Sequence, residues 1–141
     1  DLGAHAIKAT LERGGVDASV VDHVVMGNAM QTSADAIYGA RHSSLKAGIA
    51  NEVPALTVNR LCGSGIQSIV SGVQMIMSGD AEVVVAGGME NMSMVPHMLD
   101  RMRDGYRLGH AKIIDSTSEK DWSQLSIQIF VYVKLWVNTL N

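Results

Sequence analysis

The sequence has 141 residues with one cysteine, two prolines, one phenylalanine and little excess of either charge. A single cysteine forms no internal disulfide and cannot build a structural zinc site of the common cysteine-rich types. The formal net charge is -3, with no basic stripe, so we expect no nucleic-acid partner. The longest apolar stretch, residues 125–137, falls short of the roughly 20 residues that span a bilayer, so we expect no membrane partner.

The histidines also give no sign of a metal site. They show no His-Glu-x-x-His spacing, and one cysteine excludes a Cys-x-x-Cys pair. We therefore predict no metal, and we expect packing or solvated roles for all five histidines: His5, His23, His42, His97 and His110. With no sign of disulfides, the expected location is the cytoplasm. Because the chain opens on Asp1 with no leader-like segment, we expect a piece of a longer protein.

Helical and strand patterns alternate along the first two thirds of the chain. Apolar residues recur at helical spacing in three segments that end near glycines, at residues 2–14, 37–48 and 66–79. Short apolar runs typical of buried strands lie between and after them, at residues 24–26, 55–61 and 82–86. This alternation predicts an α/β domain with a mostly parallel sheet, because parallel neighbours need a crossover helix. The polar segment 96–115 is expected to leave the sheet domain.

Cys62 lies between the predicted strand 55–61 and the helix that follows. The first amides of a helix lack partners within it, and its dipole places about half a positive charge there, which favours the reactive thiolate. Gly63 and Gly65 permit a sharp turn and leave room for a bulky acyl group. This pattern suits a nucleophile. A small buried hydrophobe is the commoner role of a lone cysteine, and the spacing alone leaves both interpretations open.

Two strings around this cysteine resemble the thiolase family. They are residues 59–65 (Asn-Arg-Leu-Cys-Gly-Ser-Gly) and 85–93 (Val-Ala-Gly-Gly-Met-Glu-Asn-Met-Ser), in the family's order and at its separation. The likeness runs from Leu2 to about Asp115. It implies an incomplete thiolase-like N-terminal domain of the α/β class, with a mostly parallel sheet flanked by helices.

The same resemblance implies an acyltransferase of lipid metabolism in which Cys62 is the nucleophile. Cys62 would be acylated by a thioester such as acetyl-CoA and would pass the acyl group to a second acetyl-CoA, or cleave a 3-ketoacyl-CoA in reverse. Cys-Gly-Ser-Gly together with residues 92–97 resembles acetoacetyl-CoA thiolases more than long-chain enzymes. CoA thioesters are then substrates, no cofactor is expected, and the full-length parent is expected to form a homo-oligomer.

The family's other catalytic strings are absent from this chain. They are a Gly-His-Pro string whose histidine activates the nucleophile, a Cys-x-Gly-Gly-Gly string, an Asn-Glu-Ala-Phe motif and a His-Met-Gly stretch. We therefore expect the isolated chain to be catalytically inactive, or at most to accept one acyl group.

The resemblance also suggests a division of the chain. Residues 1–95 form the sheet domain without its first strand, 96–116 begin the excursion, and 117–141 are a tail unlike the family, in which the alternating segment 127–133 has strand character. The missing strand is expected in the middle of the sheet, where its loss would leave unpaired edges.

Two alternatives to a thiolase portion are considered. Cys-Gly-Ser also begins the nucleophile string of papain-like hydrolases, but the Cys-Trp that follows there is missing, and a strand, cysteine and helix within an α/β alternation argue against that family. The other alternative is a non-catalytic remnant that pairs with full-length subunits through residues 31–48.

Overall fold

The computed structural model describes residues 1–99, 101–117 and 132–137. Three α-helices and six strands are present in these ranges, with three short 3-10 turns. The helices are α1 (Leu2–Gly14), α2 (Gly39–Ala47) and α3 (Ser64–Ser78). The strands are β1 (His23–Gly27), β2 (Ala55–Val58), β3 (Val83–Gly88), β4 (His97–Leu99), β5 (Ile113–Asp115) and β6 (Tyr132–Val137).

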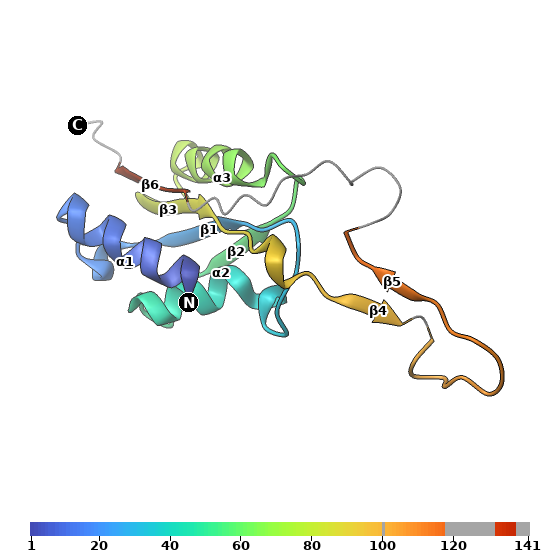
Figure 1. The fold of residues 1–141 in the computed structure, drawn as a ribbon. Coiled ribbons are helices and arrows are strands. Elements are labelled where there is room, and N and C mark those ends of the chain that lie inside the picture. The colour runs from blue at the N-terminus through green and yellow to red at the C-terminus, as the bar shows by residue number, and fades with distance from the viewer. Residues whose placement is uncertain (100, 118–131, 138–141) are drawn as a thin grey trace.

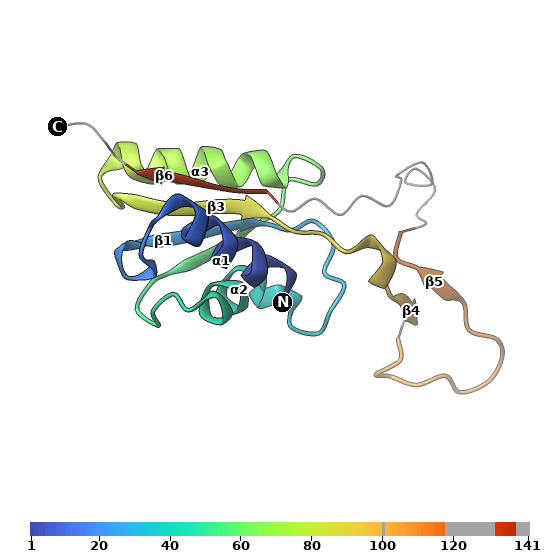
Figure 2. The same ribbon diagram turned by 60° about the vertical axis from the view of Figure 1, so that its left-hand side comes forward.

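The main sheet has the strand order β2-β1-β3-β6. Strands β2, β1 and β3 run parallel, and β6 pairs antiparallel with β3. Helices α1 and α2 cover one face of the sheet and α3 covers the other, as Figures 1 and 2 show from two sides. The predicted α/β class with a mostly parallel, helix-flanked sheet is confirmed.

The central strands are apolar because both of their faces are buried. Along β1, Val24 and Met26 pack into the cluster under α1 and α2, whereas Val25 packs into the cluster under α3. In β3 the same alternation sends Val85 to the first cluster and Val84 to the second. Residues 23–27 and 83–88 therefore form the middle of the domain: both strands contact α3, and their other face shares an apolar cluster with α1 and α2.

Helix α1 follows the predicted periodicity, whereas α3 exposes Ile66, Val70 and Met77 and buries Ser64, Ser68 and Gly72. α1 buries Ala4, Ile7 and Leu11 on one stripe, and each α-helix is followed by a glycine with positive φ, which closes the helix without Cβ strain. The second helix begins two residues later than predicted, after a 3-10 turn at Ala36–Tyr38. None of the helices in the described ranges is long and apolar enough to cross a bilayer.

The expectation of a gap in the middle of the sheet is wrong. β1 pairs with β2 on one side and with β3 on the other, in continuous parallel register. No further strand fits between them, because neighbouring strands already exchange their backbone hydrogen bonds. The sheet of the described residues therefore has no unpaired edge in its interior.

The polar segment after β3 forms a second, two-stranded sheet. β4 and β5 pair antiparallel, with His97 opposite Asp115, and this hairpin extends away from the main sheet in both ribbon views. Residues 101–112, which connect the two strands, are exposed. Of the predicted strand at 127–133, residues 127–131 lie outside the described ranges and 132–133 begin β6. The division of the chain at residues 95 and 116 stays a prediction.

The carboxyl ends of the three parallel strands lie level with one another. Gly27 at the end of β1 is the register partner of Val58 at the end of β2 and of Gly88 at the end of β3. The segments that follow these strands therefore meet at one edge of the sheet. In open α/β sheets that edge is where ligands bind.

Candidate active site at the carboxyl edge of the sheet

Cys62 is exposed on a bend between β2 and α3, immediately before Gly63, the N-cap residue of the helix. The sequence predicted a strand through residue 61, which is wrong: β2 ends at Val58. The strand stops there because the next residues turn back on themselves and make local hydrogen bonds. Cys62 is thus held by a bend at the head of a helix, and the interpretation of a buried hydrophobe does not fit its exposure.

The bend is built from short-range hydrogen bonds. The Leu61 N–H donates to Asn59 Oδ1 (3.0 Å), which closes an Asx-type turn, and the Gly63 N–H donates to the Arg60 carbonyl (3.1 Å). Leu61 has a φ of 50°, in the left-handed region that side chains other than glycine seldom adopt. Such a conformation at a non-glycine residue persists only when its surroundings hold it, and Cys62 is the next residue.

The Ser64 hydroxyl links the bend to the start of α3 through two hydrogen bonds. It donates to the Leu61 carbonyl (2.6 Å) and accepts the Arg60 N–H (2.8 Å). Ser64 itself is 4% exposed, so its hydroxyl is held inside the bend. One hydroxyl therefore pairs the Arg60 N–H and adds a second bond to the Leu61 carbonyl, which also accepts the Ser64 N–H (3.0 Å).

The first turn of α3 lies directly on the ends of β1 and β3. A β-carbon at Gly27 would come within 2.4 Å of the Ser64 carbonyl carbon and 2.7 Å of the Gly65 nitrogen. A β-carbon at Gly88 would lie 3.4 Å from the Gly65 α-carbon. Two glycines at paired positions of adjacent strands thus let the helix that follows Cys62 approach the sheet backbone closely.

Several amides at this helix start are unused. In the part of the chain that the structure describes, the N–H groups of Cys62, Gly65 and Ile66 donate to no protein acceptor. Unpaired amides at a helix N-terminus attract negative charge, including a thiolate or an oxyanion. The predicted electrostatic setting of Cys62 is therefore matched by the backbone geometry.

The loop after β1 lies beside the bend and is held by one carboxylate. Glu90 accepts the N–H of Ala29 (2.9 Å) and that of Met30 (3.1 and 3.2 Å to its two oxygens), as well as the Asn28 side-chain amide (3.2 Å). Asn28 is 8% exposed, and its Oδ1 has no partner among the described residues. The end of β3 thus fixes the conformation of residues 28–30.

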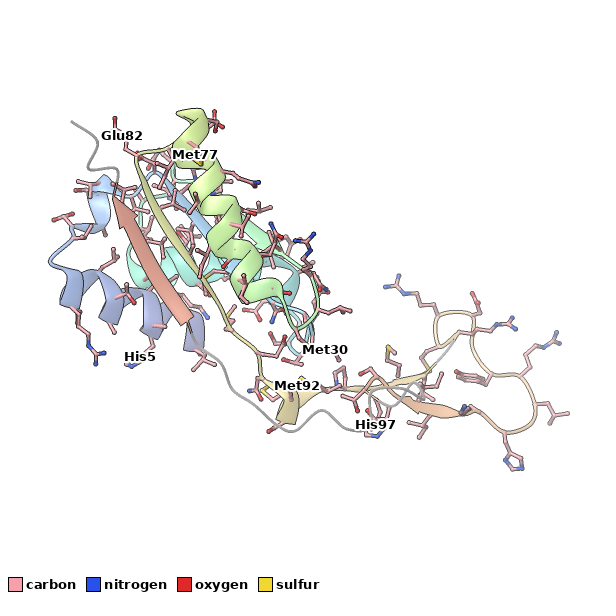
Figure 3. The ribbon with its side chains drawn as sticks, turned by 90° about the horizontal axis from the view of Figure 1, so that it is seen from above. His5, Met30, Met77, Glu82, Met92 and His97 are labelled. Carbon is pink, nitrogen blue, oxygen red and sulfur yellow. The ribbon has the colours of Figure 1, made fainter. Side chains whose placement is uncertain are left out.

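None of the histidines in the described ranges hydrogen-bonds to Cys62. His42 pairs with Asp35 (3.2 Å), and the His23 ring lies 3.2 Å from the Val24 carbonyl. Figure 3 places His5 on α1 and His97 on the hairpin, in different parts of the molecule. Nor do the described residues contain a group of three or more His, Cys, Asp or Glu side chains that suits a metal ion.

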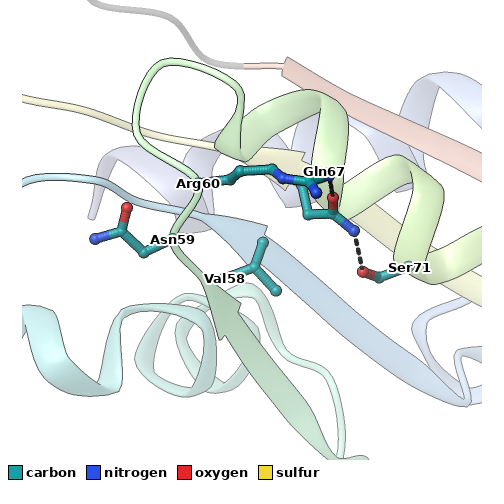
Figure 4. A pocket seen from close by; sticks show the side chains of 5 residues that line it. All are labelled: Val58, Asn59, Arg60, Gln67 and Ser71. Atoms are coloured by element: carbon teal, nitrogen blue, oxygen red, sulfur yellow. Dashed lines mark hydrogen bonds between the residues drawn. The ribbon is translucent and has the colours of Figure 1, made fainter.

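A hollow of about 390 Å³ lies next to the bend, between the end of β2 and the outer side of α3. The Arg60 guanidinium donates to Gln67 Oε1, and Gln67 Nε2 donates to Ser71 Oγ (3.2 Å), as Figure 4 shows. The remaining lining residues are Val58 and Asn59. The Arg60 guanidinium is thus engaged in hydrogen bonding along α3, although Arg60 is only two positions from Cys62 in the sequence.

The segment that contains the cysteine bend, the closely packed helix α3 and the string after β3 matches a known protein family. A family model described as "Thiolase, N-terminal domain" matches residues 1–131. The chain belongs to the thiolase family. The match runs past residue 116, and the status of residues 117–141 as a tail unlike the family stays a prediction.

Two curated relatives and one solved structure illustrate the likeness. Mitochondrial 3-ketoacyl-CoA thiolase of Bos taurus is 51% identical over 117 residues, which are 83% of this chain and 30% of the relative. Acetyl-CoA acetyltransferase of Cupriavidus necator is 48% identical over 116 residues, 82% of this chain and 29% of the relative. The crystal structure of human mitochondrial 3-ketoacyl-CoA thiolase in complex with CoA has a TM-score of 0.79 at 53% identity, covering 82% of this chain and 30% of that one.

The chain spans about 30% of the length of the thiolases it matches. Relatives with both kinds of name match at similar identity, so the acetoacetyl-CoA subtype stays a prediction. Some relatives are named as mitochondrial, and the cytoplasmic location predicted for this chain also stays a prediction.

Sequence reasoning proposed Cys62 as the candidate nucleophile but missed the residues that hold its bend. Asn59, Ser64 and Glu90 lie in the two strings that carried the family likeness, yet nothing in the strings themselves assigns them a role. The sequence did contain a signal for the close approach of α3 to the sheet. Gly27 and Gly88 each end an apolar run, and glycines at strand ends indicate a close backbone approach.

Proposed function

We propose that this chain is the nucleophile-bearing part of a thiolase, an acyltransferase in which Cys62 accepts an acyl group from a CoA thioester. The observation that carries the proposal is the exposure of Cys62 directly before the first turn of α3, where neighbouring amides are unpaired. Family membership supports the same chemistry. In the complete reaction the acyl group would pass to acetyl-CoA, or a 3-ketoacyl-CoA would be cleaved in reverse.

The geometry suits the first half of that reaction. The Cys62 sulfur would bond to the carbonyl carbon of the thioester while the bond from that carbon to the CoA sulfur breaks, and CoA would leave as a thiolate. Helix-start amides favour negative charge on the attacking sulfur and on the carbonyl oxygen. Dividing one difficult exchange into two thioester steps is the advantage of a covalent intermediate.

The second half-reaction needs groups that this chain does not supply. The described histidines lie elsewhere, and the sequence holds no second cysteine to act as acid and base. Loss of a single oxyanion donor alone lowers the rates of other enzymes by about 10² to 10³. We therefore expect the isolated chain to accept at most one acyl group and not to turn over.

A single-turnover experiment tests this proposal. The purified chain is incubated with acetyl-CoA at neutral pH, and its intact mass and site of modification are recorded by mass spectrometry. One acetyl group on Cys62 is expected, and none on Cys62→Ser under the same conditions. Absence of acetylation in a folded wild-type chain, shown by a cooperative unfolding transition, would contradict the proposal.

The alternative of a non-catalytic remnant has one structural observation in its favour. Residues 31–48 expose the apolar side chains of Ile37, Tyr38 and Leu45, which suits pairing with another subunit. Under that alternative the chain forms monodisperse dimers by light scattering, or binds a full-length thiolase subunit, and Cys62 stays unmodified by acetyl-CoA. A homo-oligomeric full-length parent is compatible with both the acyltransferase proposal and the non-catalytic alternative.

A further inference from the structure

Asn59 connects two segments that are far apart in the sequence. Its Oδ1 accepts the Leu61 N–H (3.0 Å), and its Nδ2 donates to the Ala29 carbonyl (3.1 Å). The first bond sets the turn that precedes Cys62. The second ties that turn to the loop after β1, so the bend does not rest on its own local hydrogen bonds alone.

The loop at residues 28–30 is itself anchored at its other side by Glu90. The two Glu90 oxygens accept the N–H groups of Ala29 and Met30, while Asn59 Nδ2 donates to the Ala29 carbonyl. The Asn28 amide adds a bond to the Met89 carbonyl (2.9 Å). A continuous series of hydrogen bonds therefore runs from the end of β3, through this loop, to the residue before the nucleophile.

We propose that Asn59 and Glu90 are positioning residues for Cys62, acting through the 28–30 loop that both of them hold. This inference rests on the proposed acyl-transfer function. It adds two residues that set the direction from which the Cys62 sulfur attacks the thioester. Asn59 is exposed, and its side chain belongs to neither buried apolar cluster, so its two bonds serve the bend and not the core. Leu61 at a φ of 50° is the conformation that they maintain.

Attack on a thioester demands a defined approach, whereas alkylation by a small reagent does not. A misplacement of about 1 Å can lower the rate of an oriented reaction by about 100-fold. The ratio of the two rates at Cys62 therefore reports positioning. Loss of folding would also lower the ratio, because an unfolded cysteine still alkylates but is no longer positioned for acetylation. Unfolding is therefore detected separately, by urea titration.

The test compares four single variants of the full chain, and one double variant, with wild type. Asn59→Leu removes both bonds at similar volume. Asn59→Asp keeps the acceptor for the Leu61 N–H and loses the donor to Ala29, and Glu90→Gln replaces one accepting oxygen by a donor. The control is Asn51→Leu, the same change at another exposed asparagine, which precedes β2. Among the described residues its side chain makes no hydrogen bond, and only its backbone carbonyl accepts one, from Arg41.

For each variant, acetylation of Cys62 by acetyl-CoA and alkylation by iodoacetamide are timed by mass spectrometry. Asn59→Leu is expected to lower the acetylation-to-alkylation ratio by about 10- to 100-fold, with partial recovery in Asn59→Asp. Glu90→Gln should lower the ratio in the same direction. Combining Glu90→Gln with Asn59→Leu should add little, because both act through one loop. An unchanged ratio in Asn59→Leu, or an equal loss in Asn51→Leu, would overturn the proposal.

Amide hydrogen exchange separates this inference from the proposed function. Asn59→Leu is expected to speed exchange at the Leu61 amide by about tenfold or more, and Asn51→Leu should leave it unchanged. If wild type is not acetylated while this exchange difference is seen, the acyl-transfer function fails and the positioning of the bend stands. If wild type is acetylated and neither the exchange nor the ratio changes, the positioning role fails alone.

Discussion

Gly27 in β1 lies against the backbone of Ser64 in α3, so closely that a β-carbon on Gly27 would be 2.4 Å from the Ser64 carbonyl carbon. Real β-carbons do not approach other atoms so closely, and the obstacle here is backbone that cannot rotate away. The absence of one methyl group at the end of a strand thus sets how near the sheet the helix after Cys62 can begin.

Gly27→Ala is therefore expected to destabilise the fold and to displace the start of α3. Overpacking of this kind costs about 1–3 kcal/mol, measured as the free energy of unfolding in urea. The control is Gly65→Ala in the helix itself, where a β-carbon would meet nothing within 4 Å. That variant should be neutral, or more stable by up to about 1 kcal/mol from helix propensity. Equal losses in both variants would contradict the proposed contact.

Ser64→Ala tests the hydroxyl that fastens the bend. It removes the acceptor of the Arg60 N–H and the donor to the Leu61 carbonyl in a residue that is 4% exposed. Arg60 is exposed and the Leu61 carbonyl keeps the Ser64 N–H, so the loss in urea unfolding should be that of an ordinary hydrogen bond, about 0.5–1.5 kcal/mol.

Ser93→Ala supplies the comparison for this prediction. Ser93 is exposed, and its side chain has no hydrogen bond among the described residues, so its removal should change stability by less than about 0.5 kcal/mol. If the two serine variants unfold at the same urea concentration, the Ser64 bonds do not contribute to stability as the geometry implies.

Much of this fold follows from the sequence because its signals are local. The helix at Leu2–Gly14 and the strand at His23–Gly27 were predicted from apolar periodicity and from the glycines that end each segment. The position of Cys62 at a helix start followed from the same reasoning. Both kinds of signal depend on near neighbours in the chain, where spacing determines which side chains share a face.

The rest could not be predicted because it depends on contacts between distant segments. β2 ends at Val58, and the next residue, Asn59, bonds to Leu61 and to Ala29, 30 residues earlier in the chain. The direct pairing of β1 with β3 likewise reflects strand order, which periodicity does not encode. The role of Glu90 appears only when residues 28–30 are placed beside it.

Asp35 provides a pH-dependent test away from Cys62. A hydrogen bond from the Ser33 hydroxyl (2.7 Å), and next the His42 ring (3.2 Å), lower the pKa of Asp35 from 3.8 to about 2. A lowered pKa means that the carboxylate favours the folded state above pH 3.8, and that this contribution is lost as pH falls toward about 2. Because both side chains are about half exposed, the effect on stability is small.

NMR titration of the Asp35 carboxyl carbon should therefore show a midpoint near 2. Ser33→Ala is expected to raise this midpoint toward 3.8 by more than His42→Gln does, because the Ser33 bond is the larger cause. A midpoint that stays near 2 in Ser33→Ala would assign the shift to the histidine instead.

Arg60 is close to Cys62 in the sequence, but its guanidinium is hydrogen-bonded elsewhere. A guanidinium two positions from a cysteine would be expected to stabilise its thiolate. The structure instead ties that guanidinium to Gln67, and Gln67 to Ser71, along the outer side of α3 (Figure 4). Arg60→Met keeps the stem and the backbone N–H and removes the charge. We expect it to change the rate of Cys62 acetylation by less than about threefold.

The matched control for Arg60→Met is Arg13→Met, the same change at an exposed arginine in the last turn of α1. The two variants should acetylate at similar rates, measured by mass spectrometry under single-turnover conditions. A slowing in Arg60→Met as large as that expected for Asn59→Leu, restored by Arg60→Lys, would show that the charge acts on Cys62. Without such a slowing, the electrostatic setting of the nucleophile is due to the backbone amides of α3, and the side chains around it serve to hold that backbone in place.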